Sequence, residues 1–216
     1  MVEICAFHLE DCYEAVRYGA ERLEVCQKYE LGGITPPKEW IFALRHSVHV
    51  PLVAMIRPRG GNFVYNPEEW EQMRESAMAL KRAGAHQLIF GGMTPSGRLE
   101  VSRCRALIQE WAIPCVLHRV FDALADPLQG VEDAISAGFI RILTGYGQND
   151  PGLLQEIKRK AAGRIDILPG GGIRSSNAQA YVDMGFQQVH SSAILDKKQR
   201  VSGPEVQALL AALHRG

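Results

Sequence analysis

Short apolar runs alternate strictly with amphipathic helical segments along the chain, and this alternation limits the possible folds more than any other feature of the sequence. The largely apolar runs cover eight segments: residues 2–7, 22–26, 51–56, 87–90, 114–118, 140–144, 165–169 and 188–190. Each has the length of a buried parallel strand. After each run, apolar residues recur at helical spacing, as Trp70, Met73, Ala77 and Leu80 do. Eight strand–helix units in 216 residues predict an α/β protein with a (β/α)8 TIM-barrel fold.

Nothing in the sequence divides this pattern into separate domains. We find no linker and no low-complexity tract, so we expect residues 1–216 to form a single TIM-barrel domain. A glycine ends every second predicted helix, at positions Gly19, Gly84, Gly138 and Gly185. The left-handed cap that ends many helices explains this spacing, and a barrel built from repeated quarters explains it equally well.

Composition excludes several classes of protein. Lys plus Arg and Asp plus Glu both number 24, which argues against a general nucleic-acid or anionic-membrane surface. No apolar run approaches the roughly 20 residues of a membrane span, and no leader precedes the first predicted strand. The five cysteines are odd in number and lack C-x-x-C spacing, which argues against a disulfide framework and a zinc ribbon. We expect a soluble cytoplasmic protein with no nucleic-acid or membrane partner.

The first two predicted strands place polar residues on the parity that fills a barrel interior. These residues are Glu3, Cys5, Glu24 and Cys26. A buried charge needs a partner, and we expect the partners to be Arg57, His118 and Arg141. Glu3 comes early in its strand, so we expect it in a structural ion pair, whereas Glu24 lies higher and is the better candidate for acid/base chemistry.

An arginine stretch follows the third predicted strand. Arg57 and Arg59 flank a proline and precede two glycines. Arginines held against a rigid turn present planar forks of N–H donors that suit a carboxylate or a phosphate. We therefore predict that both arginines bind an anion at the barrel mouth. Pairing with carboxylates of the fold itself is an equally compatible explanation.

The loops after the last two predicted strands favour the same kind of ligand. Backbone N–H groups in a glycine loop before a helix can hold an anion, and these two loops often bind phosphate in barrels. We assign five residues here to ligand binding: Gly171, Gly172, His190, Ser191 and Ser192. A tight turn that merely needs glycines is the other explanation.

Three ionisable residues lie at the mouth end of the fifth predicted strand. His118 titrates in a range that suits proton transfer, and Asp122 is placed to orient it or hold it charged. We take Glu24, His118 and Asp122 as candidate catalytic residues, and Arg119 and Thr144 as ligand-binding residues at the same mouth. A salt-bridged rim without catalytic function is the alternative.

The two inward cysteines raise the question of a metal. Cys5 and Cys26 share a parity on neighbouring strands, and two thiolates can hold a soft ion such as Cu(I). Buried cysteine is also a small, inert hydrophobic residue. Spacing alone favours the inert interpretation.

Several segments together resemble one known family over the whole chain. They are residues 3–5, 22–26, 32–36, 56–61, 118–122, 143–144, 169–173 and 189–193. The arginine–glycine segment and the His-Arg-x-Phe-Asp segment, in this order, are specific to the CutC copper-homeostasis family. The resemblance implies a TIM barrel and a cytoplasmic protein linked to copper handling. It also implies Cys5 and Cys26 as Cu(I) ligands.

Three functions are compatible with these observations. The resemblance implies a copper-homeostasis protein that binds Cu(I). The strand-end residues indicate instead a barrel enzyme that acts on a small phosphorylated or carboxylated metabolite by acid/base chemistry. A ligand-binding barrel without catalysis is the third function. The expected partner is therefore a small anionic ligand or a copper ion, and a homo-oligomer is compatible with the sequence.

Overall fold

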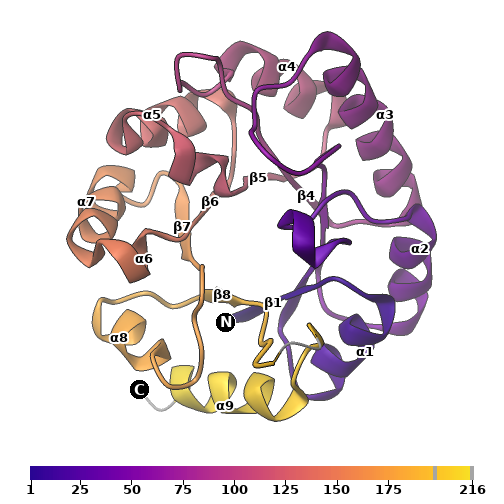
Figure 1. Cartoon of the computed structure of the whole chain (residues 1–216), viewed down its shortest axis with the longest axis vertical. Coiled ribbons are helices and arrows are strands. Elements are labelled where there is room, and N and C mark those ends of the chain that lie inside the picture. Colours follow the sequence, from indigo (N-terminus) through magenta and orange to yellow (C-terminus); the bar gives the residue numbers. More distant parts are fainter. Residues whose placement is uncertain (197–198, 215–216) are drawn as a thin grey trace.

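Eight parallel strands form a nearly closed barrel with helices on its outside (Figure 1). The structure, a computed structural model, describes residues 1–196 and 199–214. The strands are β1 (Val2–Ala6), β2 (Arg22–Val25), β3 (Leu52–Met55), β4 (Gln87–Phe90), β5 (Cys115–Leu117), β6 (Arg141–Thr144), β7 (Asp166–Pro169) and β8 (Val189–Ser191). Their number confirms the prediction, although several strands are a residue shorter at one or both ends than the apolar runs.

The strands follow one another around the ring in sequence order. Their order in the sheet is β7-β6-β5-β4-β3-β2-β1-β8, and every neighbouring pair is parallel. Within the described residues no strand ladder joins β7 to β8, so the ring is closed there by packing rather than by strand hydrogen bonds. The sequence-based prediction of a (β/α)8 TIM barrel is confirmed.

Helices cover the outside of the ring. The described part of the chain contains nine α-helices: α1 (Leu9–Arg17), α2 (Lys38–Ser47), α3 (Pro67–Ala83), α4 (Val101–Trp111), α5 (Pro127–Ala137), α6 (Tyr146–Asn149), α7 (Pro151–Ala161), α8 (Ala178–Asp183) and α9 (Gly203–Leu213). Side-chain chemistry fixes their ends. Asn66 and Glu69 form a capping box around Pro67 at the start of α3, and Gly84 ends that helix with a φ of 106°.

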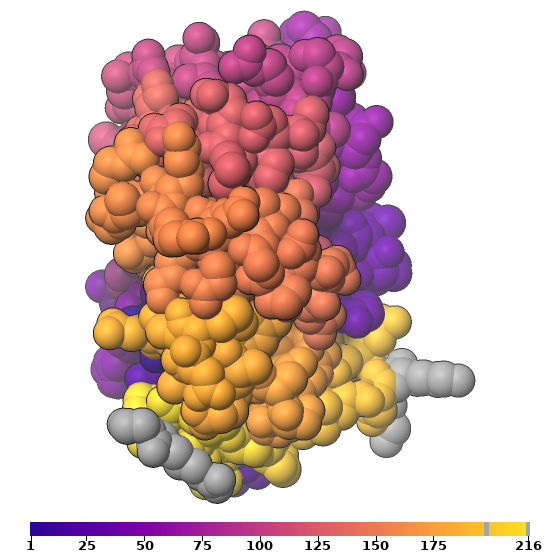
Figure 2. All heavy atoms as spheres, turned by 90° about the vertical axis from the view of Figure 1, so that its left-hand side faces the viewer, coloured from indigo at the N-terminus to yellow at the C-terminus, as the bar shows by residue number. Residues whose placement is uncertain are grey.

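Three short elements were not expected from the sequence. They are α6, which precedes α7, and two 3-10 helices, η1 (Tyr29–Leu31) and η2 (Arg119–Ala123). In Figure 1, η1 is the short dark purple turn that lies over the barrel opening. On the opposite side of the ring, α5, α7, α8 and α9 succeed one another down one face of the molecule (Figure 2). These outer helices leave the mouth accessible from the strand C-termini.

The strand parity predicted from the sequence is confirmed. Inward side chains from the strands form a separate buried cluster that includes Cys5, Cys26, Val53 and Met55. The opposite parity, with residues such as Ile4 and Leu23, packs against the helices. No helix in the described residues is long and apolar enough to cross a membrane.

Candidate functional site

A pocket of about 710 Å³ opens at the C-terminal ends of the strands. Ten of the twelve candidate residues for catalysis or ligand binding belong to segments that meet there: Glu24, Arg57, His118, Arg119, Asp122, Gly171, Gly172, His190, Ser191 and Ser192. Cys5 also lines it. Three candidates do not line the pocket: Arg59, Thr144 and Cys26. The barrel topology brings most of the candidates together because their strands all end at the same face.

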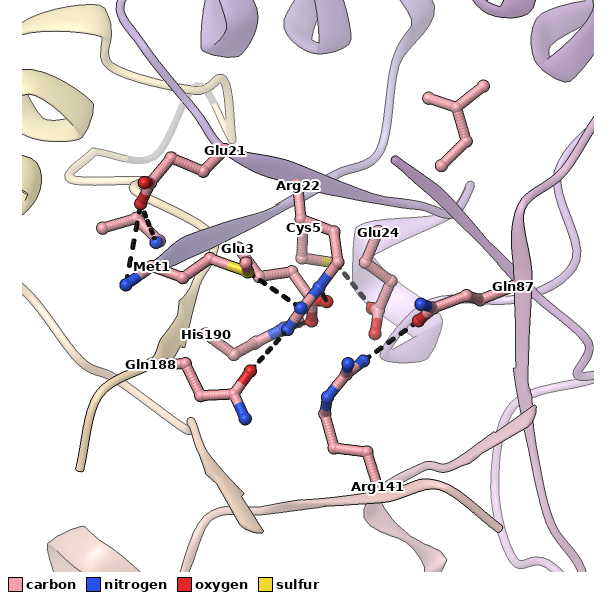
Figure 3. Close-up of polar contacts among 12 residues, drawn as sticks. Met1, Glu3, Cys5, Glu21, Arg22, Glu24, Gln87, Arg141, Gln188 and His190 are labelled. Carbon is pink, nitrogen blue, oxygen red and sulfur yellow. Dashed lines mark hydrogen bonds and ion pairs between the residues drawn. The ribbon is translucent and has the colours of Figure 1, made fainter. Parts of the chain in front are cut away.

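Two thiols and one carboxylate meet at the wall of this pocket. Strand register places Cys5 opposite Glu24, and Cys26 follows two residues after Glu24. The Cys5 and Cys26 sulfurs are 3.8 Å apart. Both thiols hydrogen-bond to the same Glu24 oxygen, Oε1, at 3.0 Å from Cys5 and 3.3 Å from Cys26. Figure 3 shows the Cys5–Glu24 contact.

Burial keeps both thiols protonated. It raises the pKa of Cys5 well above its usual range, and the neighbouring Cys26 and Glu24 raise it further. Burial and the charge of Glu24 raise the pKa of Cys26 to about 12, although a hydrogen bond with Cys5 opposes this shift. A cation that drew off these protons would find three ligand atoms, since Cys5, Glu24 and Cys26 each offer one within 4.8 Å of the others.

Glu3 lies deeper in the barrel and is fully paired. Arg22 and His190 both contact its carboxylate, His190 through Nδ1 at 2.7 Å from Oε1 (Figure 3). These are the register neighbours of Glu3 on β2 and β8. Burial alone would raise the pKa of Glu3, but the His190 hydrogen bond and the Arg22 charge outweigh it and lower that pKa to about 2. Burial opposes the charged form of His190, yet Glu24 and Glu3 together raise its pKa.

The prediction that Arg57, His118 and Arg141 neutralise the two interior glutamates is therefore wrong. Glu3 uses Arg22 and His190, and Glu24 uses two thiols. Arg141 instead donates to Gln87 at 3.0 Å. The expectation that Glu3 forms a structural ion pair, with Glu24 nearer the pocket, agrees with the structure.

Arg57 lines the pocket, but the Nη groups of its guanidinium donate hydrogen bonds to backbone carbonyls. Its Nη1 donates to the carbonyl oxygens of Leu31, Gly32 and Gly33 at 3.0–3.1 Å. Its Nη2 donates to the carbonyl of Gly61 at 2.9 Å. The guanidinium also stacks on Phe63, at 4.8 Å from the ring centroid. Arg57 therefore fastens η1 over the mouth, and its Nε–H has no partner among the described residues.

Arg59 points away from the pocket. Its Nε pairs with Glu69 at 2.5 Å, and its Nη groups donate to the carbonyls of Asn62 and Val64 at 2.9 Å. Of the two explanations for this arginine, pairing with a carboxylate of the fold is the one that the geometry favours.

His118 is neutral and its ring is oriented by the backbone. Its Nδ1 accepts the Val120 N–H at 3.2 Å. Burial, and then the charge of Arg57, lower the pKa of His118 to about 3. Because Nδ1 is an acceptor, the ring hydrogen of the neutral form sits on Nε2. Nε2 is buried and has no partner among the described residues.

Asp122 does not orient His118, contrary to the expectation. It accepts from Arg119 Nε at 2.7 Å, from Thr144 Oγ1 at 2.7 Å and from the Gly145 N–H at about 3 Å. It therefore ties η2 to the end of β6. Thr144 takes part in this connection but does not line the pocket. Arg119 takes part in it on the side that faces solvent.

The loops after β7 and β8 are joined by an arginine that sequence reasoning missed. Arg174 donates to Ser191 Oγ at 3.3 Å, to Ser192 Oγ at 3.4 Å and to the Ile194 carbonyl at 2.8 Å. The amides of Gly171 and Gly172 have no acceptor in the described structure. The aromatic wall residues Phe7, Tyr29 and Phe63 were also missed, because no local pattern marks a loop aromatic that folds over a barrel mouth.

The fold and this pocket define a (β/α)8-barrel protein with a polar, largely buried site at the strand C-termini. A sequence profile of the CutC family matches residues 1–195, and the chain belongs to the CutC family. The resemblance inferred from the sequence motifs is thereby confirmed.

Relatives with curated names support this membership. A CutC family protein from Treponema denticola is 36% identical over 200 residues, which are 89% of this chain and 81% of the relative. A Homo sapiens relative named copper homeostasis protein cutC homolog is 34% identical over 199 residues, covering 89% of this chain and 73% of its own. The crystal structure of a CutC protein from Streptococcus agalactiae matches with a TM-score of 0.82 at 28% identity, over 89% of this chain and 98% of that one.

Proposed function

We propose that this chain acts in copper homeostasis by binding one Cu(I) ion between Cys5 and Cys26, with Glu24 as a third ligand. The observation that carries the proposal is the 3.8 Å separation of the two sulfurs. Thiolate bonds to zinc are about 2.3 Å long, so two sulfurs on one ion of similar size lie at most about 4.6 Å apart. Soft thiolates select Cu(I) over harder ions. The copper-homeostasis names of relatives point the same way.

Because the pKa values of both thiols are raised, this site needs a group that can take up their protons when a metal binds. Both thiols must lose a proton when they ligate a metal. Glu24 accepts both S–H groups on one oxygen and so stands where those protons leave. Cys5 lines the pocket, whereas Cys26 is fully buried, and the ion would therefore arrive through the mouth. We also propose the reducing cytoplasm as the compartment, because all five cysteines are free thiols.

A Cu(I) competition titration under anaerobic, reducing conditions tests the site. Wild type should bind one Cu(I) per chain, and the double variant Cys5→Ser, Cys26→Ser should lose that binding while keeping most of its stability. Cys104→Ser is the matched control, since Cys104 is equally buried but lies in the outer core. Because two protons are displaced, affinity should rise up to about a hundredfold per pH unit near neutrality. Equal affinity of wild type and double variant would remove these cysteines from the proposal.

A further inference from the structure

Three residues that line the mouth pocket each carry a buried polar atom without a hydrogen-bond partner in the described structure. Among the described residues eight buried side-chain polar atoms have no hydrogen-bond partner, and three of them belong to residues that line this one pocket. They are His118 Nε2, Glu24 Oε2 and Arg57 Nε. Their side chains are almost wholly buried, with 2%, 2% and 6% of each residue exposed. Leaving buried polar atoms unpaired is unfavourable, so their grouping indicates a site that a polar ligand completes.

Two of these atoms are hydrogen-bond donors on one side of the pocket. The neutral His118 ring carries its hydrogen on Nε2, and Arg57 carries one on Nε. Both side chains pack on Phe63, whose ring centroid lies 4.9 Å from that of His118 and 4.8 Å from the Arg57 guanidinium carbon. Two donors that share one aromatic neighbour can serve one carbonyl oxygen of the ligand, and a neutral imidazole can polarise that carbonyl.

The third atom is an acceptor. Glu24 comes from β2, and its Oε1 is occupied by the two thiols. Its Oε2 remains free for the ligand. The surrounding wall contains Phe7, Met55 and Leu143, which keep this carboxylate away from bulk water. A carboxylate in such surroundings is suited to take a proton from carbon next to a polarised carbonyl.

We propose that this pocket catalyses the enolisation of a small α-hydroxy carbonyl compound. Glu24 Oε2 takes the proton from the carbon that bears the hydroxyl, and the electrons of that C–H bond form a C=C bond. The carbonyl oxygen receives the hydrogen of His118 Nε2, which gives an enediol. The enediol hydroxyl on the other carbon returns a proton to His118, while Glu24 returns its proton to the former carbonyl carbon. The net reaction is an aldose–ketose isomerisation, which needs no oxidant or reductant.

The loops after β7 and β8 bear on whether the substrate carries a phosphate group. The free amides of Gly171 and Gly172 line the same pocket as the three unpartnered atoms. Such amides can hold a phosphate, so the substrate is either a free hydroxy ketone or its phosphate ester. This proposal does not depend on copper binding, although Glu24 contributes one oxygen to each site.

Deuterium incorporation tests the proposal. Full-length protein, kept free of copper with a Cu(I) chelator and reductant, is incubated in D2O with dihydroxyacetone, D-erythrulose or dihydroxyacetone phosphate. Proton NMR then follows the replacement of C–H by C–D. Wild type should exchange with at least one compound, and both Glu24→Gln and His118→Gln should slow that exchange by about a hundredfold or more. Cys104→Ser should exchange like wild type, and thermal melts should show that both pocket variants are folded.

The kinetic constants separate a chemical role of His118 from a structural one. His118→Gln should lower kcat for exchange with little change in KM, and because the pKa of His118 is lowered to about 3, it should leave the shape of the pH profile between about pH 5.5 and 8 unchanged. If the phosphate ester exchanges faster than the free ketones, the glycine amides bind the phosphate group of the substrate. Equal rates would identify a neutral hydroxy ketone as the substrate class. Absence of exchange above the Glu24→Gln background for all three compounds overturns the proposal, and so does undiminished exchange in both folded variants.

Discussion

At the scale of single residues, the site is governed by which charges find partners. Glu3 has two cationic contacts that lower its pKa to about 2, whereas burial and the charge of Arg57 lower the pKa of His118 to about 3. The contacts of Glu3 join β1 to β2 and β8, and the low pKa of His118 keeps its ring a neutral hydrogen-bond donor in the pocket. Glu24 accepts hydrogen bonds from the two thiols and also lines the pocket.

The Glu3 pair predicts a specific acid dependence of stability. Its pKa is about 2 in the folded protein and about 4.5 when unfolded, so the unfolded state binds more protons between these values. The stabilisation is therefore complete above about pH 4.5 and is lost as the pH falls through about 2, by about 3 kcal/mol in the free energy of unfolding. Urea unfolding from pH 2 to 6 measures it.

Variants of two glutamates separate this effect from general acid unfolding. Glu3→Gln should be less stable at neutral pH, because Arg22 loses its counter-charge, and it should show a flatter acid dependence. Glu132 also has a pKa lowered to about 2, by Arg164 and Lys160, but it is on the surface. Glu132→Gln should keep the wild-type slope, since water screens exposed pairs. An unchanged slope in Glu3→Gln would show that Glu3 is not the group responsible.

At the scale of elements, the barrel mouth depends on one arginine that holds a loop. The segment after β2 returns on itself through a Gln27–Ile34 bridge and carries η1 over the pocket. Arg57, just after β3, donates to three consecutive carbonyls of this segment. Gly33 allows the segment to lie this low: its φ is 85°, and a Cβ there would lie 3.3 Å from the Cys26 sulfur.

Arg57→Met should therefore destabilise the protein more than it weakens any bound anion. The variant keeps the aliphatic stem but leaves the carbonyls of residues 31–33 and Gly61 without their donor, and we expect a loss of about 2–5 kcal/mol. Arg74→Met, which removes exposed pairs with Glu71 and Glu110, should leave the stability close to that of wild type. Thermal melts with and without phosphate provide the measurement. Near wild-type stability combined with loss of a phosphate-induced increment would instead assign Arg57 to anion binding.

The elements show which parts of the structure a sequence can predict. Strands and helices followed from apolar periodicity, and strand parity placed Glu3, Cys5 and Glu24 inside, because both depend only on local spacing. The partners of Glu3 could not be predicted from the sequence in this way. They are set by the register of β1 against β2 and β8, which places Arg22 and His190 at its own level. Parity assigns a face of the sheet but no depth along the barrel, so residues at strand ends were chosen wrongly.

At the scale of the whole molecule, the barrel has one weaker seam. β1 pairs with both β2 and β8, whereas β8 pairs only with β1 in the described structure. β8 is a short strand of three residues. Side chains compensate for the missing ladder to β7: His190 contacts Glu3, and Gln188 accepts from Arg22 at 3.0 Å. The polar cluster in Figure 3 therefore fastens the last strand of the barrel to the first two.

Hydrogen exchange should reveal this seam. Opening free energies vary within a fold, and strands with few backbone partners open first. In wild type we expect the amides of β8 to exchange faster than those of β2, which has ladders on both sides.

His190→Leu removes the contact with Glu3 and should accelerate exchange in residues 187–192 by at least about tenfold relative to β2, which corresponds to about 1.4 kcal/mol. His118→Leu is the matched control, a buried histidine on the far side of the ring whose loss should leave residues 187–192 unchanged. Peptide-resolved mass spectrometry provides the measurement. If His190→Leu instead accelerates exchange evenly around the ring, the barrel opens as one unit and its closure does not rest on the Glu3–His190 contact.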